Sequence, residues 1–479
     1  MRPVVSHRFI ASLWHDRRGV VGLYFAVIIS VMLLLCMAAL DMVRVHMARS
    51  RIFVAMDSAM LAAGRSLGTD NWAQVGVNYF NANMNAGTTL GAKVTMTADS
   101  FKTTPSNLGG DEVALTVTGT IPLWSAGVGN ISEINVSRTT KALRRSQTVE
   151  LAMVLDNTGS MTTGDNIGAL RTDALLLLKT LSGGRTTGTL SYSRVALVPY
   201  SAAVNPGAES KKIISDGTVY DPTNVLGWRG CVIERAAPNT TADTTAAAAA
   251  WTPYVWAPAI DNKYVKGDAG SVRAEWYYGN SSTGPNVGCP TPITPLTDDI
   301  TRLTTDINAM QAWFRGGTLS DIGMAWGLRV LSPEPPFTEG TAWTNTNVKK
   351  AVVLMTDGDA NFFKLGNEDT PNKVNDAVLS DFTGYGRLDE FGRIGTTDKN
   401  TAKAKINSNL SSTCTAMKAR NIHVYTITFG TGSVNDTTRA FYKACASDAA
   451  SYFSAADQTQ LKKAFSSIGG ALTELIIIE

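Results

Sequence analysis

Three short segments carry oxygen-bearing side chains that could together hold a metal ion: DNTGS at 156–160, GGT at 316–318 and TDG at 356–358. The candidate ligands in them are two carboxylates and three hydroxyls: Asp156, Asp357, Thr158, Ser160 and Thr318. Magnesium prefers such oxygen ligands and usually keeps several waters. Because only two of these ligands are charged, the ion would stay electrophilic. A carboxylate from another molecule could then complete its coordination shell.

The elements around these segments predict where they meet. Apolar runs at 151–155 and 351–355 directly precede the first and third segments. Strands are expected at 149–155, 195–200, 351–355, 422–429 and 451–453. Helices are expected at 166–181, 301–314, 321–330, 402–419, 436–446 and 458–475. Apolar strands that alternate with amphipathic helices indicate an α/β fold with a doubly wound, mostly parallel sheet. Ligands in such folds bind beyond the carboxyl ends of the strands.

Composition excludes several classes of protein. The chain has 479 residues, enough for two or three domains, and its 44% hydrophobic content supports a large core. The net charge is only +3 and no basic run occurs, so nucleic acid is not an expected partner. The 4 histidines are too scattered to build a zinc hydrolase site.

An apolar segment near the start of the chain predicts a membrane anchor. Val20 to Leu40 carries no charge, and 21 residues at about 1.5 Å each can cross a hydrocarbon layer about 30 Å thick. The run is longer than that of a typical secretory signal, which is the alternative. The expected organisation is a cytoplasmic segment 1–18, a transmembrane helix 19–41, a stalk helix 42–69, a small α+β module 70–146 and the α/β domain 147–479, with insertions at about 205–295 and 359–400.

The cysteines bear on the compartment. Cys36 lies in the apolar span, and the other four allow three pairings. Cys231 with Cys289 would staple the first insertion, and Cys414 with Cys445 would join two late segments. Disulfides need an oxidising compartment, so these pairings favour a domain outside the cytoplasm. The alternative is four buried thiols in the cytosol.

The first insertion is rich in aromatic residues, which admit two interpretations. They could fill a small core of their own, or they could form an exposed face for a partner. The residues are Trp228, Trp251, Tyr254, Trp256, Trp276, Tyr277 and Tyr278.

The three oxygen-bearing segments resemble a known site. VLDNTGSM at 154–161, GGT at 316–318 and VVLMTDGD at 352–359 are similar to the metal-ion-dependent adhesion site of von Willebrand factor type A domains. The resemblance implies a doubly wound α/β fold that binds Mg²⁺ or Mn²⁺ through the five candidate ligands. Thr318 stands where many members have serine, and it keeps the hydroxyl.

Longer stretches resemble TadG-like proteins of the Tad (Flp) pilus assembly machinery. These are 16–67, with AMDSAMLAAG at 55–64, and the stretches 295–333 and 414–465. The resemblance implies a single-pass protein of the bacterial inner membrane, with a cytoplasmic N-terminus and a periplasmic adhesion domain. Its partners would be pilus-assembly or pilin-like proteins, bound through an acidic residue. Tyr24 follows Gly19 at the place where pilin-like components carry glutamate, so pilin-type processing is not expected.

Two other functions compete with adhesion. The segments also resemble the motifs of haloacid-dehalogenase-like phosphohydrolases, in which Asp156 would be the nucleophile. Such enzymes usually carry a second acid two residues later, and Thr158 stands there instead. The other alternative is a structural envelope protein with an unused metal site. The sequence favours a binding protein over an enzyme.

Overall fold

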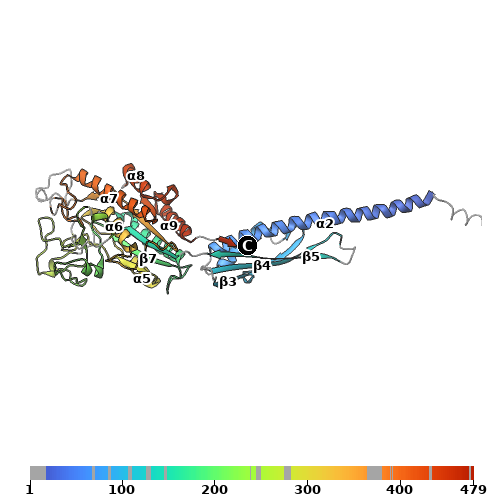
Figure 1. Cartoon of the computed structure of the whole chain (residues 1–479), viewed down its shortest axis with the longest axis horizontal. Coiled ribbons are helices and arrows are strands. Elements are labelled where there is room, and N and C mark those ends of the chain that lie inside the picture. Colours follow the sequence, from blue (N-terminus) through green and yellow to red (C-terminus); the bar gives the residue numbers. More distant parts are fainter. Residues whose placement is uncertain are drawn as a thin grey trace, which may run out of the picture. The chain divides into compact units, whose positions relative to one another are not determined.

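The computed structural model divides the chain into two compact units, residues 1–144 with 475–479 and residues 145–474. The structure describes residues 18–66, 71–84, 88–105, 111–125, 131–144, 148–237, 239–243, 250–273, 282–363, 380–388, 390, 392–430, 434–473 and 476–478. Figure 1 shows the helices and strands of both units, coloured along the sequence.

The second unit is built on a six-stranded sheet with the strand order β10–β7–β6–β12–β14–β15. The strands are β6 (Thr148–Asp156), β7 (Ser193–Tyr200), β10 (Thr294–Thr297), β12 (Val348–Thr356), β14 (His423–Phe429) and β15 (Tyr452–Ala455). Neighbours pair in parallel, except that the edge strand β10 pairs antiparallel with β7. From β6 the chain continues to β7 on one side of it and later to β12 on its other side. The direction in which successive strands are added to the sheet therefore changes between β6 and β12.

Helices cover both faces of this sheet, because alternate side chains of each strand point to opposite faces. Leu151 and Met153 of β6 share a core with α4 (Asn166–Leu181), α5 (Ile300–Ala309) and α9 (Gln458–Leu472). Ala152 and Val154 share the other core with α6 (Ser320–Leu331), α7 (Lys399–Ala419) and α8 (Asp436–Cys445). The predicted doubly wound, mostly parallel α/β fold is confirmed.

One predicted helix is too long. The helix expected over 301–314 ends at Ala309, and Met310 is already extended with φ −60° and ψ 137°. The chain then runs beside the first oxygen-bearing segment, where the Trp313 backbone N–H donates to the Asn157 carbonyl at 2.6 Å. The apolar residues after 309 therefore line a loop instead of a helix face.

The first unit combines one long helix with an antiparallel sheet. Helix α2 (Arg18–Arg65) is continuous, and α3 (Trp72–Asn83) follows it. The sheet contains β1 (Thr88–Thr89), β2 (Ala92–Thr95), β3 (Phe101–Pro105), β4 (Asp111–Pro122), β5 (Glu133–Arg144) and β16 (Ile476–Ile478). Ile52 and Met56 of α2 pack with Phe80 of α3 and with apolar residues of the sheet. Residues 22–64 are long and apolar enough to cross a membrane.

The last strand comes from the end of the chain, which the sequence does not predict. The helix expected over 458–475 ends at Leu472, and β16 pairs antiparallel with β5 through Ile476 opposite Leu143. The sheet of the first unit therefore contains residues from both ends of the sequence.

The four cysteines outside the apolar span form the two pairs that the sequence favours. Cys231 bonds to Cys289 and Cys414 bonds to Cys445, whereas Cys36 is unpaired. Within the first insertion, Tyr254 and Trp256 are buried in a small cluster that includes the Cys231–Cys289 disulfide.

Other aromatic residues of the insertion pack elsewhere. Trp228 and Trp251 are buried in the main core instead, so the insertion is not a separate body. Residues 276–278 of the aromatic group lie outside the described residues.

Candidate metal site

The first segment turns back on its own carboxylate. Asp156 is the last residue of β6, and a short 3-10 helix begins at Gly159. The backbone N–H and the hydroxyl of Thr158 both donate to Asp156 Oδ1, at 2.8 and 2.6 Å. The hydroxyls of Thr158 and Ser160 lie 2.9 Å apart. The alternate side chains 156, 158 and 160 thus lie close together.

The third segment meets the first across the sheet. β12 and β6 are parallel neighbours with Met355 opposite Leu155, so their carboxyl ends lie at the same edge. Asp357 follows directly after β12, and the Ser160 hydroxyl donates to Asp357 Oδ1 at 2.5 Å. Each of the two hydroxyls therefore donates to one of the two carboxylates, and their oxygens lie side by side between them.

The second segment needs its two glycines. Gly316 and Gly317 have φ of +82° and +113°, a region that favours glycine. A Cβ on Gly316 would lie 2.1 Å from the Ala202 Cβ, and one on Gly317 would lie 2.3 Å from the Asn361 carbonyl oxygen. β11 (Gly317–Thr318) pairs with β13 (Asn361–Phe362), and the Thr318 N–H donates to Asn361 Oδ1 at 3.2 Å. The loop is thus fixed by close backbone packing.

Thr318 lies with Ser160 beside Gly358. A Cβ built on Gly358 would lie 3.8 Å from Ser160 Oγ and 4.0 Å from Thr318 Oγ1. Thr158, Ser160 and Thr318 also line one cleft of about 430 Å³. The structure therefore brings the five predicted residues together at one edge of the sheet.

The two carboxylates are buried, and the charge of Asp156 affects the pKa of Asp357. Asp156 is 0% exposed and Asp357 is 3% exposed. Burial raises the pKa of Asp156, while burial and the charge of Asp156 raise the pKa of Asp357 to about 7. Two such carboxylates next to neutral hydroxyls fit a divalent cation, which would offset their mutual repulsion. Within the described residues, no three His, Cys, Asp or Glu side chains gather to hold a metal.

Two supporting residues were not predicted. The Thr356 hydroxyl donates to Asp156 Oδ2 at 2.8 Å, and the Tyr200 hydroxyl lies 3.3 Å from the same oxygen. Thr356 could have been recognised as the last residue of a strand, directly before Asp357. Tyr200 ends the neighbouring strand β7 opposite Asp156, so strand register was the available signal.

A buried network of ion pairs fixes the loop that carries the second segment, 316–318. Arg315 precedes Gly316, and its guanidinium bonds to both carboxylate oxygens of Asp381 at 2.5 and 2.9 Å. The Gly316 N–H also donates to Asp381 Oδ2 at 3.2 Å. Asp381 comes from the second insertion, so this insertion fixes the loop that carries Thr318.

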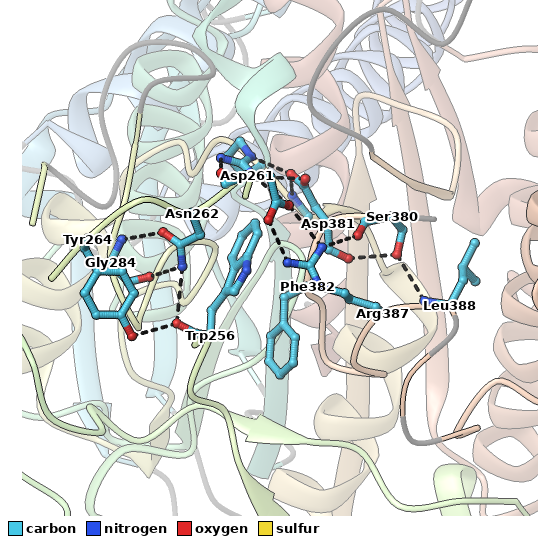
Figure 2. A network of polar contacts seen from close by, with 12 residues as sticks. Trp256, Asp261, Asn262, Tyr264, Gly284, Ser380, Asp381, Phe382, Arg387 and Leu388 are labelled. Atoms are coloured by element: carbon cyan, nitrogen blue, oxygen red, sulfur yellow. Dashed lines mark hydrogen bonds and ion pairs between the residues drawn. The ribbon is translucent and has the colours of Figure 1, made fainter. Parts of the chain in front are cut away.

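The first insertion joins the same network. Arg387 bonds to both oxygens of Asp261 at 3.0 and 2.8 Å, and the Arg315 guanidinium lies 3.4 Å from Asp261 Oδ2. Figure 2 shows the Asp261 and Asp381 carboxylates near each other, with Trp256 and Phe382 beside the network. The two guanidinium groups lie 4.6 and 5.3 Å from the Trp256 ring centre. No signal in the sequence pointed to these contacts between insertions.

No family model and no curated protein match this chain. Among solved structures, it is similar to the vWF domain of the type V pili tip protein Mfa5 from Porphyromonas gingivalis, with 13% identity and a TM-score of 0.34 over 67% of this chain and 93% of that one. It is also similar to the open conformation of the pilus adhesin SpaC from Lactobacillus rhamnosus GG, with 11% identity and a TM-score of 0.33 over 80% and 34% of the two chains.

A third similar structure is proximal thread matrix protein 1 from the mussel byssus with a zinc occupied MIDAS motif. The identity is 10% and the TM-score 0.30, over 69% of this chain and 46% of that one. At these scores the assignment of site residues rests on the geometry of this chain and not on the similar structures.

Proposed function

We propose that the second unit is a metal-dependent protein-binding domain. Mg²⁺ or Mn²⁺ would be held by Asp156, Thr158, Ser160, Thr318 and Asp357, and an acidic side chain of a partner would complete the shell. The observation that carries the proposal is that Thr158 and Ser160, whose hydroxyl oxygens lie 2.9 Å apart, donate to Asp156 and Asp357 respectively and line an open cleft. Few charged ligands leave the cation able to bind a further carboxylate.

The same geometry argues against the phosphohydrolase alternative. Asp156 is 0% exposed and each of its oxygens accepts a hydroxyl hydrogen bond. Such a carboxylate can hold a small ion directly or through water, but a nucleophile must attack a much larger phosphomonoester. Thr158 occupies the place of the second acid. A protein-binding role without catalysis therefore remains the better proposal. The structural alternative predicts no metal binding at all.

The cellular setting of the proposal comes from the sequence and from the apolar helix. Resemblance to TadG-like proteins supports a component of Tad (Flp) pilus assembly whose partners are pilus-assembly or pilin-like proteins. Helix α2 would anchor the chain once in the bacterial inner membrane with its N-terminus in the cytoplasm. Two disulfides suit a periplasmic second unit.

Calorimetric titration of the full chain with MgCl₂ and MnCl₂ tests the metal site. We expect the wild type to bind one ion, and Asp357→Asn to lose binding. Asp359→Asn is the matched control, because this carboxylate lies two residues later and contacts Lys403 and Asn435 instead. Equal binding by wild type and Asp357→Asn would refute the residue assignment.

Peptide capture tests the partner chemistry. Immobilised peptides containing Glu should retain the full chain in Mg²⁺, whereas the matched Gln peptides, or EDTA, should abolish retention. Release of phosphate from phosphomonoesters by wild type, lost in Asp156→Asn, would instead establish the enzyme alternative.

A further inference from the structure

We infer that the tip of the β4–β5 hairpin in the first unit lies in the lipid headgroup layer, beside the point where α2 leaves the membrane. The tip consists of residues 122–125 and 131–133 among the described residues. The occupant of this surface would be the bilayer itself. The inference rests on the proposed membrane anchor and adds a second membrane contact to it.

The first step is that the length of the uncharged run sets the depth of Asp41 in the membrane. If the uncharged run from Val20 to Leu40 fills the hydrocarbon layer, its 21 residues span about 31 Å at about 1.5 Å per residue. This length matches a hydrocarbon thickness of about 30 Å. Asp41, the next residue, therefore lies at the border between hydrocarbon and headgroups.

The second step is that the hairpin tip is bound to Asp41. Its Oδ1 accepts the Trp124 backbone N–H at 3.0 Å, and its Oδ2 accepts both the N–H and the hydroxyl of Ser125 at 2.8 Å. These bonds leave Asp41 only 3% exposed. The tip must therefore share the depth of Asp41, whatever the tilt of the helix.

Arg44 strengthens the same attachment. Its guanidinium donates to the Pro122 carbonyl, lies 4.6 Å from the Trp124 ring centre and is 3.6 Å from Asp41 Oδ1. The hairpin thus covers an acid and a base that would otherwise face the edge of the hydrocarbon layer, where unpaired charges are costly. Figure 1 shows the hairpin running alongside α2.

The third step is the character of the surface that remains. At the tip, Trp124 is 66% exposed and Ile131 is 59% exposed. Met42 and Val43, which follow Asp41 on α2, are 78% and 59% exposed. Tryptophan is enriched at membrane interfaces, because its ring is apolar and its N–H is polar. Exposed apolar side chains at the depth of Asp41 fit a lipid surface.

Quenching by lipids tests this depth. The full chain is reconstituted into vesicles of phosphatidylethanolamine and phosphatidylglycerol that contain a lipid with a nitroxide near its headgroup. One sample carries an environment-sensitive fluorophore on the native Cys36, which is unpaired and exposed. Two further samples, both in a Cys36→Ser background, carry it on Ile131→Cys or on Thr116→Cys. Thr116 is exposed and lies six residues before Pro122 on β4, about 20 Å away at about 3.4 Å per residue.

We expect the labels at 36 and 131 to be quenched, with quenching at 131 at least threefold greater than at 116. If the label at 36 is quenched but those at 131 and 116 are equally unaffected, the anchor stands and the inference about the tip is wrong. Such a tip would face water or another protein. If none of the labels is quenched, both the anchor and the inference are overturned.

A substitution provides a second test. Because the Trp124 ring is largely exposed, Trp124→Ser should leave the fold intact and should reduce quenching at 131 at least twofold. Val219→Ser is the matched control, since Val219 is 77% exposed in the second unit. Unchanged quenching in Trp124→Ser would contradict a contribution of this ring to membrane contact.

Discussion

Thr158 and Ser160 each share a hydrogen bond with a buried carboxylate of the candidate site. A hydroxyl that donates its proton to a carboxylate keeps its oxygen lone pairs available for a cation. The hydroxyls therefore do two things at once, since they hold the carboxylates in place and present neutral oxygen ligands. This arrangement keeps the total charge of the site low.

The contribution of Ser160 can be measured. Ser160→Ala removes a ligand and also the hydrogen bond to Asp357, and hydrogen bonds to charged groups contribute about 1.5–3 kcal/mol. We expect Mg²⁺ affinity to fall at least about tenfold, because 1.4 kcal/mol corresponds to a factor of ten. Thr162→Ala is the control, since Thr162 lines the same cleft but bonds to the Gly159 carbonyl. Equal titration curves for all three proteins would exclude Ser160 as a ligand.

A second buried acid should make stability depend on pH. Asp321 is 2% exposed, accepts hydrogen bonds from Tyr385 and Asn409, and has a pKa that burial raises to about 7. Because the folded state holds this proton to higher pH than the unfolded chain, the free energy of unfolding falls as pH rises from about 4 to about 7.

The variant Asp321→Asn should weaken this dependence. We expect urea unfolding to show a smaller loss of stability between pH 5 and pH 8 than in the wild type. The exposed Asp216→Asn should behave like the wild type. An identical loss in Asp321→Asn would mean that other groups cause the pH dependence.

The sequence reveals the five candidate ligands because each follows a strong local pattern. Two lie at the ends of apolar strands, and the hydroxyls lie in glycine-containing turns next to them. The residues that hold these ligands from a distance could not be found in this way. Asp381 and Asp261 lie in the two insertions, where no periodicity says which side chains are buried.

The elements position the site by their order and their ends. β6 and β12 are adjacent and parallel, so two segments 200 residues apart meet at one edge, as the bond between Thr356 and Asp156 shows. Helix α5 ends early so that residues 310–314 can pass along the first segment. Both insertions contact Arg315, which lies in the loop before Thr318, through Asp381 and Asp261. The strands thus bring the candidate ligands together, and the inserted loops fix the loop that carries Thr318.

Arg315 should affect stability and metal binding together. Arg315→Met leaves Asp381 and Asp261 with fewer buried partners, and breaking a buried ion pair costs about 3–5 kcal/mol. We expect a lower melting temperature and weaker Mg²⁺ binding, because the loop with Gly316 is released. Arg273→Met, on an exposed residue of the first insertion, should change neither. Unaltered Mg²⁺ affinity in a folded Arg315→Met protein would show that the network does not position the site.

Two short strands were not predictable from the sequence. β10 was not expected, because Thr294–Thr297 is short, contains proline and lies at the sheet edge. β16 was not expected either, since a short apolar run after a helix is compatible with more helix as well as with a strand. In both cases the pairing partner lies far away in the sequence, and it decides the outcome.

At the scale of the whole molecule, the cysteines divide between two environments. Cys36 lies on the apolar part of α2, whereas both disulfides lie in the second unit. The sequence indicated this division because the apolar span is continuous and the other cysteines are distant from it. The return of the last strand to the first unit was not expected.

Counting thiols in protein from cells tests the compartment. Denatured protein treated with a maleimide polymer should gain one modification before reduction and five after it, because the chain has 5 cysteines, four of them in disulfides. Cys36→Ser should reduce these numbers to none and four. Five modifications without reduction would place the second unit in a reducing compartment.

The pairing of β16 with β5 has a consequence for how the two units can be separated. The chain leaves the first unit after β5 and comes back to lie beside the same strand, with Ile476 opposite Leu143. The second unit is therefore joined at both of its ends to paired strands of the first unit, β5 and β16. A protease that cuts one connecting peptide would leave the second unit attached through the other. Release of the second unit would require two cuts, or one cut and separation of the three isoleucines of β16 from β5.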